Sequence, residues 1–389
     1  MRRHIRLPFA AALAALLALS GCSKDKSADQ PAKLVMIKTR LQVKKLWSTD
    51  LGGGKHQMLL HLGLGPAVAG GLVYAASHKG LVEALRVTNG RRVWRARLRM
   101  PISAGPGTGD GLVVVGSTQG EIVALDAGSG QVRWRTHVDA ELLSAPAIGD
   151  SVVVLRSVDG RLQAFDENSG KPIWSIEQQV PRLSLRGIAT PVIVKHEVVS
   201  GFDNGKIVAV NINNGNTLWS TTLDAPRGRT ALDRLVDVDC GVAVVGDNLY
   251  ATGYHGRTAQ LAIDSGQIWW AHNMSSDHGL AADAKTVYVS EADGSVVALR
   301  AQDGAEIWHN DVLKWRDLSA PAITSAAIVV GDYQGYLHWM DKKTGVIIAR
   351  TRDSKFRVSS PPIAIGNTVI VMSDGGEVAA FRAAPRPTG

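Results

Sequence analysis

Short runs of apolar residues, separated by turn residues, recur along most of the chain. One such unit spans residues 120–134 and reads GEIVALDAGSGQVRW, with an apolar run at 122–125. Continuous apolar runs of this length, bounded by Gly and Asp, are typical of β-strands that are buried on both faces. The Asp and Gly after the run are preferred in tight turns. Each unit is therefore predicted to be a strand, a turn and a second strand.

The unit repeats with a fixed step of fourteen residues from its first Gly to its last Trp. The complete copies begin at Gly80, Gly120, Gly160, Gly205, Gly256 and Gly294. A seventh copy begins at Gly335 but has Ala349 in place of the Trp, and an eighth begins at Gly376 and ends before its Trp. In six of the eight copies an Ala follows the Gly by four residues, where a small side chain would let neighbouring sheets pack closely. Copies about 40 residues apart indicate a solenoid or a propeller.

The two ends of the chain supply the parts that complete a ring. The eighth copy lacks its last strand, while residues 43–49 place Trp47 on a strand that has no copy before it. We therefore predict an all-β fold, an eight-bladed β-propeller of four-stranded antiparallel blades, closed by the Trp47 strand in the last blade. Each Trp is expected to bury its ring between adjacent blades. The alternative is an open solenoid with frayed ends.

The N-terminus has the three parts of a secretion signal. MRRHIR is basic, residues 7–19 are apolar, and Leu-Ser-Gly directly precedes Cys22. The apolar stretch is too short to span a membrane. The tetrapeptide that ends at Cys22 resembles the lipobox of bacterial lipoproteins, which implies that residues 1–21 are removed and that lipid is attached to Cys22. No Asp follows the Cys directly, which resembles an outer-membrane sorting signal.

Composition divides the rest of the chain into three parts. Residues 22–41 are mostly polar and lack a hydrophobic period, so they are expected to form a flexible tether. Residues 42–384 carry the repeats and form the propeller, and residues 385–389 form a tail. No second domain is expected.

Charge and cysteine content argue against nucleic-acid binding and against a disulfide. The net charge is +8, but the basic residues are scattered, and a secreted protein of this kind is not expected to bind nucleic acid. Cys240 is the only cysteine besides Cys22, so no disulfide is expected. Its apolar neighbours at 238–245 favour a buried structural thiol.

Three connections between blades are longer than the others. From the Trp to the residue that introduces the next inner strand takes 12 residues after Trp94 and Trp134, but 19 after Trp47, 17 after Trp174 and 22 after Trp219. All three join the outermost strand of one blade to the innermost strand of the next, and such connections emerge on one face of a propeller. Insertions in a repeat fold are where function is usually added. Those after Trp174 and Trp219 follow consecutive blades and should lie side by side.

These two insertions contain the candidate functional residues. The first reads RLSLRG, in which Leu183 and Leu185 alternate with polar residues, and Arg186 follows. The second reads TALDRLVDVD, in which Asp237 and Asp239 share one face if the segment is extended. One interpretation is a docking surface. The other is internal packing, with both leucines under the loop and Arg186 paired to either Asp. The two are compatible, since a preorganised Arg–Asp pair can border an interface.

The sequence shows no legible catalytic or metal-binding arrangement. His56 and His61 are five residues apart, which is no recognised ligand spacing. The chain resembles quinoprotein dehydrogenases, which hold pyrroloquinoline quinone and calcium on the axis of an eight-bladed ring, in the Gly–Trp repeat only. It lacks the adjacent Cys pair typical of those enzymes and any haem-attachment motif. We therefore interpret it as a non-enzyme with no cofactor and no metal; a quinone- or ligand-binding propeller is the alternative.

The lipobox, the repeats and the insertions together closely resemble the BamB family, lipoprotein subunits of the machinery that folds β-barrel proteins into the bacterial outer membrane. The most specific motifs are LSLRG at 183–187, DRL-x-DVD at 233–239 and GDYQGYLHW at 331–339. The resemblance covers the whole chain. It implies a scaffold, lipid-anchored at the periplasmic face of the outer membrane, that binds the periplasmic (POTRA) domains of BamA, the barrel subunit, and aids insertion of barrel proteins.

The same resemblance assigns the contact with BamA to particular positions. The residues that match are Leu183, Leu185, Arg186, Asp237 and Asp239. Exposed blade edges could also pair with extended strands of nascent outer-membrane proteins, which would make those proteins a second class of partner.

Overall fold

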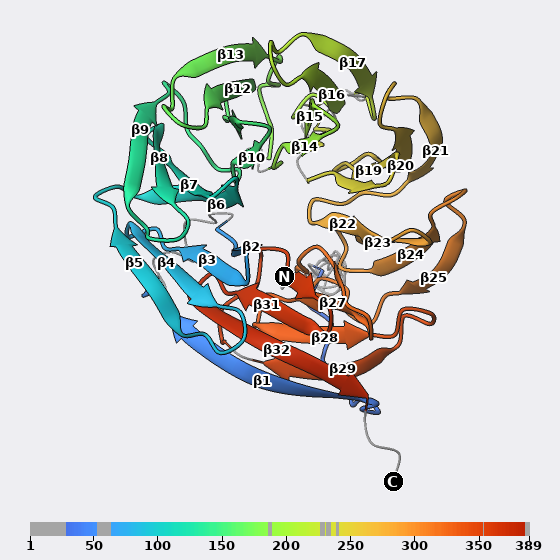
Figure 1. The fold of residues 1–389 in the computed structure, drawn as a ribbon. Coiled ribbons are helices and arrows are strands. Elements are labelled where there is room, and N and C mark those ends of the chain that lie inside the picture. The colour runs from blue at the N-terminus through green and yellow to red at the C-terminus, as the bar shows by residue number, and fades with distance from the viewer. Residues whose placement is uncertain are drawn as a thin grey trace, which may run out of the picture.

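The computed structural model describes residues 29–52, 64–185, 189–225, 230, 235–238, 241–352 and 354–385. Within them, 32 β-strands form eight sheets of four strands each. All the pairings are antiparallel, and the sheets are arranged as blades around a common axis (Figure 1). The predicted eight-bladed propeller is confirmed. None of the described residues forms a helix of the length and apolar character needed to cross a bilayer.

Seven blades consist of four consecutive strands each. Blades one and two contain β2 (Ala67–Ala69), β3 (Leu72–Ala76), β4 (Leu81–Arg86), β5 (Arg92–Arg97), β6 (Ile102–Gly109), β7 (Leu112–Ser117), β8 (Glu121–Asp126) and β9 (Val132–His137). Blades three and four contain β10 (Ala147–Gly149), β11 (Val152–Arg156), β12 (Arg161–Asp166), β13 (Pro172–Glu177), β14 (Val192–Val194), β15 (Glu197–Gly201), β16 (Lys206–Asn211) and β17 (Thr217–Thr222). Blades five and six contain β18 (Ala243–Val245), β19 (Asn248–Thr252), β20 (Arg257–Ala262), β21 (Ile268–Asn273), β22 (Gly279–Ala282), β23 (Thr286–Ser290), β24 (Val296–Arg300) and β25 (Glu306–Asn310). Blade seven contains β26 (Ala322–Ile323), β27 (Ile328–Gly331), β28 (Tyr336–Met340) and β29 (Ile347–Arg352).

Blade eight is assembled from both ends of the chain. Its inner strands are β30 (Ile363–Ile365), β31 (Thr368–Met372) and β32 (Glu377–Pro385), and its outermost strand is β1 (Leu41–Asp50). The register runs from Leu41 opposite Pro385 to Asp50 opposite Glu377. Figure 1 shows β1 along the outer edge of this blade, beside β32. The predicted closure by the Trp47 strand is confirmed.

The repeat Trp residues lie at the boundaries between blades. Trp134 is 7% exposed, and its indole Nε1–H donates to the backbone oxygen of Glu167 in the next blade, at 2.6 Å. Its ring lies against Gly170, where a Cβ would come within 2.5 Å of it. Gly170 also has a φ of +67°, so the turn needs glycine for two reasons. The equivalent indole bonds are made by Trp47, Trp94, Trp174, Trp219, Trp270 and Trp308.

Blade seven reverses the positions of its large and small residues. In blade two the cross-strand pair is Ala124 opposite Trp134, whereas in blade seven it is Trp339 opposite Ala349. Trp339 is fully buried, and it belongs to the same apolar cluster as Ala349 and Leu41 of β1. Neighbouring side chains therefore occupy space beside Ala349, as expected.

The absence of a Trp on β29 follows from the closure of the ring. In the other blades, the Trp packs on a Gly in the turn between the third and fourth strands of the next blade. Blade eight has no such turn, because β32 is the last strand of the chain and β1 is the first. A Trp at position 349 would therefore have no glycine turn on which to pack.

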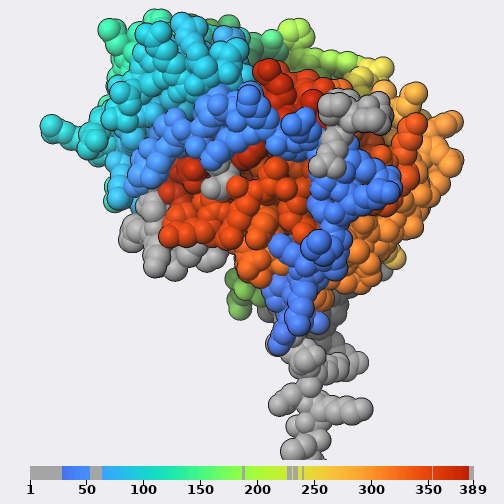
Figure 2. Space-filling model, turned by 90° about the horizontal axis from the view of Figure 1, so that it is seen from below, coloured from blue at the N-terminus to red at the C-terminus, as the bar shows by residue number. Residues whose placement is uncertain are grey.

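Residues 29–40, before β1, run along the outer side of blade seven (Figure 2). The backbone N–H of Ala32 donates to Lys314 O at 2.9 Å, and that of Arg40 donates to Ile348 O at 2.8 Å. Leu34 and Ile37 pack against the apolar cluster of blades six and seven. The predicted tether thus has a described part that lies on the propeller, because it carries two apolar residues that the blades half-bury.

Candidate docking surface

The long connections after blades three and four lie next to each other. The backbone N–H of Leu185, in the first, donates to Asp237 Oδ2, in the second, at 2.6 Å. This bond joins two segments that are 52 residues apart in the sequence. The predicted contact between the two insertions is confirmed.

The two leucines of the first insertion lie at the surface. Leu183 is 42% exposed and Leu185 is 40% exposed, which places both among the exposed large apolar residues of the chain. Internal packing predicted that both would lie beneath the loop, and they do not. Both leucine side chains instead face solvent, while the backbone N–H of Leu185 is hydrogen-bonded to Asp237.

Asp237 holds the loop from within the fold and is only 1% exposed. Its backbone oxygen accepts a hydrogen bond from Tyr254 N at 2.8 Å, and the next residue, Val238, donates from its N–H to Phe202 O at 3.2 Å. These bonds draw residues 235–238 between the turns of blades four and five, where all four are buried. Asp237 therefore acts beneath the leucines, and not as the exposed charge that an extended rim strand would present.

A buried ion pair lies close to Asp237. Arg156, at the end of β11, donates from Nη2 to Asp203 Oδ1, and each residue is 1% exposed. The Arg156 guanidinium also lies over the ring of Phe202, 5.3 Å from its centroid. The charges of Arg156 and Asp203 act on Asp237 in opposite directions.

Burial shifts the titration of Asp237. Burial raises the pKa of Asp237 to about 6, and the negative charge of Asp203 adds to this increase. The N–H of Leu185 and the charge of Arg156 act in the opposite direction. The carboxyl that positions the leucine loop therefore changes its charge close to neutral pH.

The remaining predicted residues lie outside the described part of the chain. These are Cys22, His56, His61, Arg186, Asp239 and Cys240. Among the described residues, no group of three or more His, Cys, Asp or Glu side chains is arranged to hold a metal ion. Arg156 and Asp203 were not predicted as site residues from the sequence. Their only signals are a charged residue that ends the apolar run of β11 and an Asp that resembles an ordinary turn residue.

Comparison with known proteins identifies the family. The family model described as "Outer membrane protein assembly factor BamB" matches residues 78–310 and 292–385. The chain belongs to this family. A BamB relative from Pseudomonas aeruginosa is 46% identical over 96% of this chain and 98% of the relative. One from Alkalilimnicola ehrlichii is 45% identical over 95% of this chain and 96% of the relative. Both relatives carry the name "Outer membrane protein assembly factor BamB".

Solved structures share the fold. The crystal structure of BamB from Moraxella catarrhalis is 28% identical and matches with a TM-score of 0.80, over 88% of this chain and all of that one. Quinohemoprotein alcohol dehydrogenase from Comamonas testosteroni matches with a TM-score of 0.68 at 14% identity, over 89% of this chain and 78% of that one. At this identity the dehydrogenase shows a common propeller architecture and nothing of its chemistry.

Proposed function

We propose that this protein is a non-enzymatic lipoprotein scaffold in the assembly of outer-membrane β-barrel proteins. Membership of the BamB family supports the role in assembly. Cleavage after residue 21 would leave Cys22 to carry the lipid, at the periplasmic face of the outer membrane. Residues 22–41 would then connect the lipid to the propeller of 42–384, with 385–389 as its tail.

The proposed partner is the periplasmic POTRA region of BamA. The observation that carries this proposal is the pair of exposed leucines, Leu183 and Leu185, held by a hydrogen bond to a buried carboxylate. An apolar pair that is already fixed in place loses little conformational entropy on binding, which favours it as the centre of an interface. Arg186 and Asp239 would flank the leucines and select the partner by charge, while Asp237 positions the loop.

Co-purification with BamA tests the docking surface. The double variant Leu183→Ala/Leu185→Ala removes two exposed side chains, so it should melt near the wild-type temperature while BamA recovery falls at least tenfold. The matched control is Val93→Ala/Ile173→Ala, which truncates two residues of similar exposure (41% and 45%) on the outermost strands of blades one and three. A folded leucine variant that recovers BamA as well as the control would refute the assignment.

Reversing the charge of Arg186 is a second test of the docking surface. Arg186→Glu should abolish BamA recovery without unfolding the protein. Arg99→Glu is the control, because Arg99 is an exposed arginine in the corresponding connection after blade one.

The alternative, a quinone-binding propeller, is tested by adding pyrroloquinoline quinone and calcium. Stoichiometric binding with dye-linked oxidation of an alcohol would overturn the scaffold proposal.

A further inference from the structure

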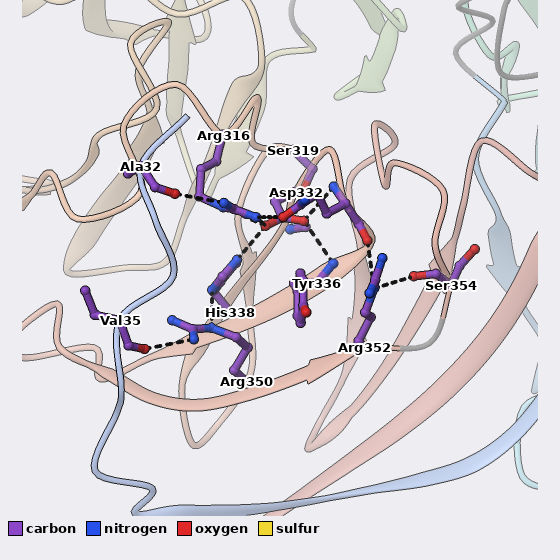
Figure 3. A network of polar contacts seen from close by, with 12 residues as sticks. Ala32, Val35, Arg316, Ser319, Asp332, Tyr336, His338, Arg350, Arg352 and Ser354 are labelled. Atoms are coloured by element: carbon purple, nitrogen blue, oxygen red, sulfur yellow. Dashed lines mark hydrogen bonds and ion pairs between the residues drawn. The ribbon is translucent and has the colours of Figure 1, made fainter. Parts of the chain in front are cut away.

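Blade seven contains a buried charged cluster that the docking surface does not use (Figure 3). Asp332 is fully buried, and its Oδ2 accepts hydrogen bonds from Arg316 Nε at 2.9 Å, Arg316 Nη2 at 2.6 Å and His338 Nε2 at 3.0 Å. Burial raises the pKa of Asp332, but the hydrogen bonds from His338 and Arg316 outweigh it, so that the pKa is lowered. Burial lowers the pKa of His338, which favours the neutral imidazole. Buried charges of this kind are costly unless they are fully paired, so their use here calls for a function.

Two arginines of this cluster hold the N-terminal segment. Arg316 Nη1 donates to Ala32 O at 2.9 Å, and Arg350 Nη1 donates to Val35 O at 3.0 Å. Arg350 is itself oriented by His338, whose Nδ1 accepts from Arg350 Nε at 3.3 Å. Figure 3 shows the segment beside these side chains. We call residues 29–40 the arm, since the cluster fixes their backbone against the propeller.

The fixed backbone determines which side chains of the arm face outward. Leu34 and Ile37 point to the apolar core of blades six and seven. Between them, Val35 is 54% exposed and Met36 is 100% exposed. Lone exposed apolar residues are common on proteins, but a fully exposed Met next to an exposed Val on a segment held by two arginine side chains is an ordered apolar tip.

Basic residues flank this tip in the sequence. Lys33, Lys38 and Arg40 are all exposed, and Asp29 is the only acidic residue of the arm. An apolar tip flanked by basic side chains matches the boundary between the acyl chains and the anionic headgroups of a phospholipid layer. The arm also lies close to the proposed anchor in sequence. The seven residues from Cys22 to Asp29 span at most about 25 Å when fully extended.

We propose that the arm is a membrane-contacting surface for anionic phospholipid. Val35 and Met36 enter the headgroup layer, and Lys33, Lys38 and Arg40 bind the lipid phosphates. The arm also turns the outer side of blade seven toward the membrane, because the buried cluster prevents the arm from swinging freely. This inference rests on the proposed lipidation of Cys22.

A depth measurement on the full-length lipoprotein tests the arm. A nitroxide label is attached at Met36→Cys in a Cys240→Ser background, and the protein is reconstituted in phosphatidylethanolamine vesicles with or without phosphatidylglycerol. With phosphatidylglycerol, the ratio of oxygen to nickel-chelate accessibility of the label should rise several-fold. The added substitutions Lys33→Glu, Lys38→Glu and Arg40→Glu should abolish the rise, while the melting temperature stays the same because all three side chains are exposed.

A second label position is the control. Asn214→Cys places the nitroxide in the exposed turn between β16 and β17, across the ring from β1 (Figure 1), and it should remain water-accessible in both vesicles. Protein that floats with vesicles while the Met36→Cys label stays in water overturns the membrane contact but not the anchor. Protein that does not float at all overturns the lipid anchor, and the inference falls with it.

Discussion

Replacing Asp237 by Asn should remove a buried charge while keeping the oxygen that Leu185 needs. The wild-type carboxylate accepts the Leu185 N–H at 2.6 Å, and an Asn side-chain oxygen can accept the same bond. The leucine loop should therefore keep its position. The substitution removes the free-energy cost of ionising a buried carboxyl, because an amide stays neutral at every pH.

The magnitude follows from the shift in pKa. The pKa of Asp237 is raised from 3.8 to about 6 in the folded protein. A carboxyl whose pKa is raised by folding contributes stability that is fully present below its pKa in the unfolded chain. This contribution is lost as pH rises through its pKa in the folded protein. Two units correspond to about 3 kcal/mol, since one unit is about 1.4 kcal/mol. The Asn variant lacks this loss, so its stability relative to wild type should increase by about 3 kcal/mol between about pH 3 and pH 8.

Urea unfolding of both proteins across this pH range is the assay. Any pH-independent cost of burying the amide group shifts the whole difference curve but does not change its slope, so the slope is the quantity to compare. Asp126→Asn is a control of opposite sign, because hydrogen bonds from Arg133 and Ser129 lower the pKa of Asp126 to about 2. That variant should lose stability relative to wild type as pH rises from about 2 to about 5, and the difference should stay constant at higher pH. A flat difference curve for Asp237→Asn would refute the buried-charge argument.

Three further predictions concern the ring. Deleting residues 41–50 removes the outermost strand of blade eight, so the melting temperature, measured by circular dichroism, should fall sharply. Trp134→Phe removes an indole hydrogen bond and should cost about 1 kcal/mol in urea unfolding, whereas Gly170→Ala should cost about 2 kcal/mol or more because it adds a clash to an unfavourable φ. Trp339→Ala should cost about 3–5 kcal/mol, and adding Ala349→Trp should not restore that stability, since no glycine turn receives the new ring.

The repeat made the architecture predictable, down to the pairing of strands from the two ends. The fixed spacing from Gly to Trp predicts one blade for each copy of the repeat. The additional Trp47 strand near the N-terminus predicts how the ring closes. Ala349 looked like a departure from the repeat, yet it follows from that closure, because the last blade has no turn on which a Trp could pack.

The docking surface was only partly predictable. Position in the insertions indicated the leucines, but the burial of Asp237 depends on contacts with Phe202 and Tyr254, which belong to the turns of other blades. Likewise, Arg350 looks in the sequence like an ordinary surface residue of the seventh copy. Its bonds to His338 and to the arm arise from residues that are distant in sequence, so no local pattern signals them.

The assembly of blade eight from both termini constrains the order in which the protein is made and folded. β1 is synthesised first, but its hydrogen-bonding partner, β32, is synthesised last. Until then, each completed blade can fold locally, while β1 waits with both edges unpaired and prone to wrong pairing. Closure of the ring is therefore a checkpoint for a complete chain. A prematurely terminated copy would lack β32 and leave β1 without a strand to join.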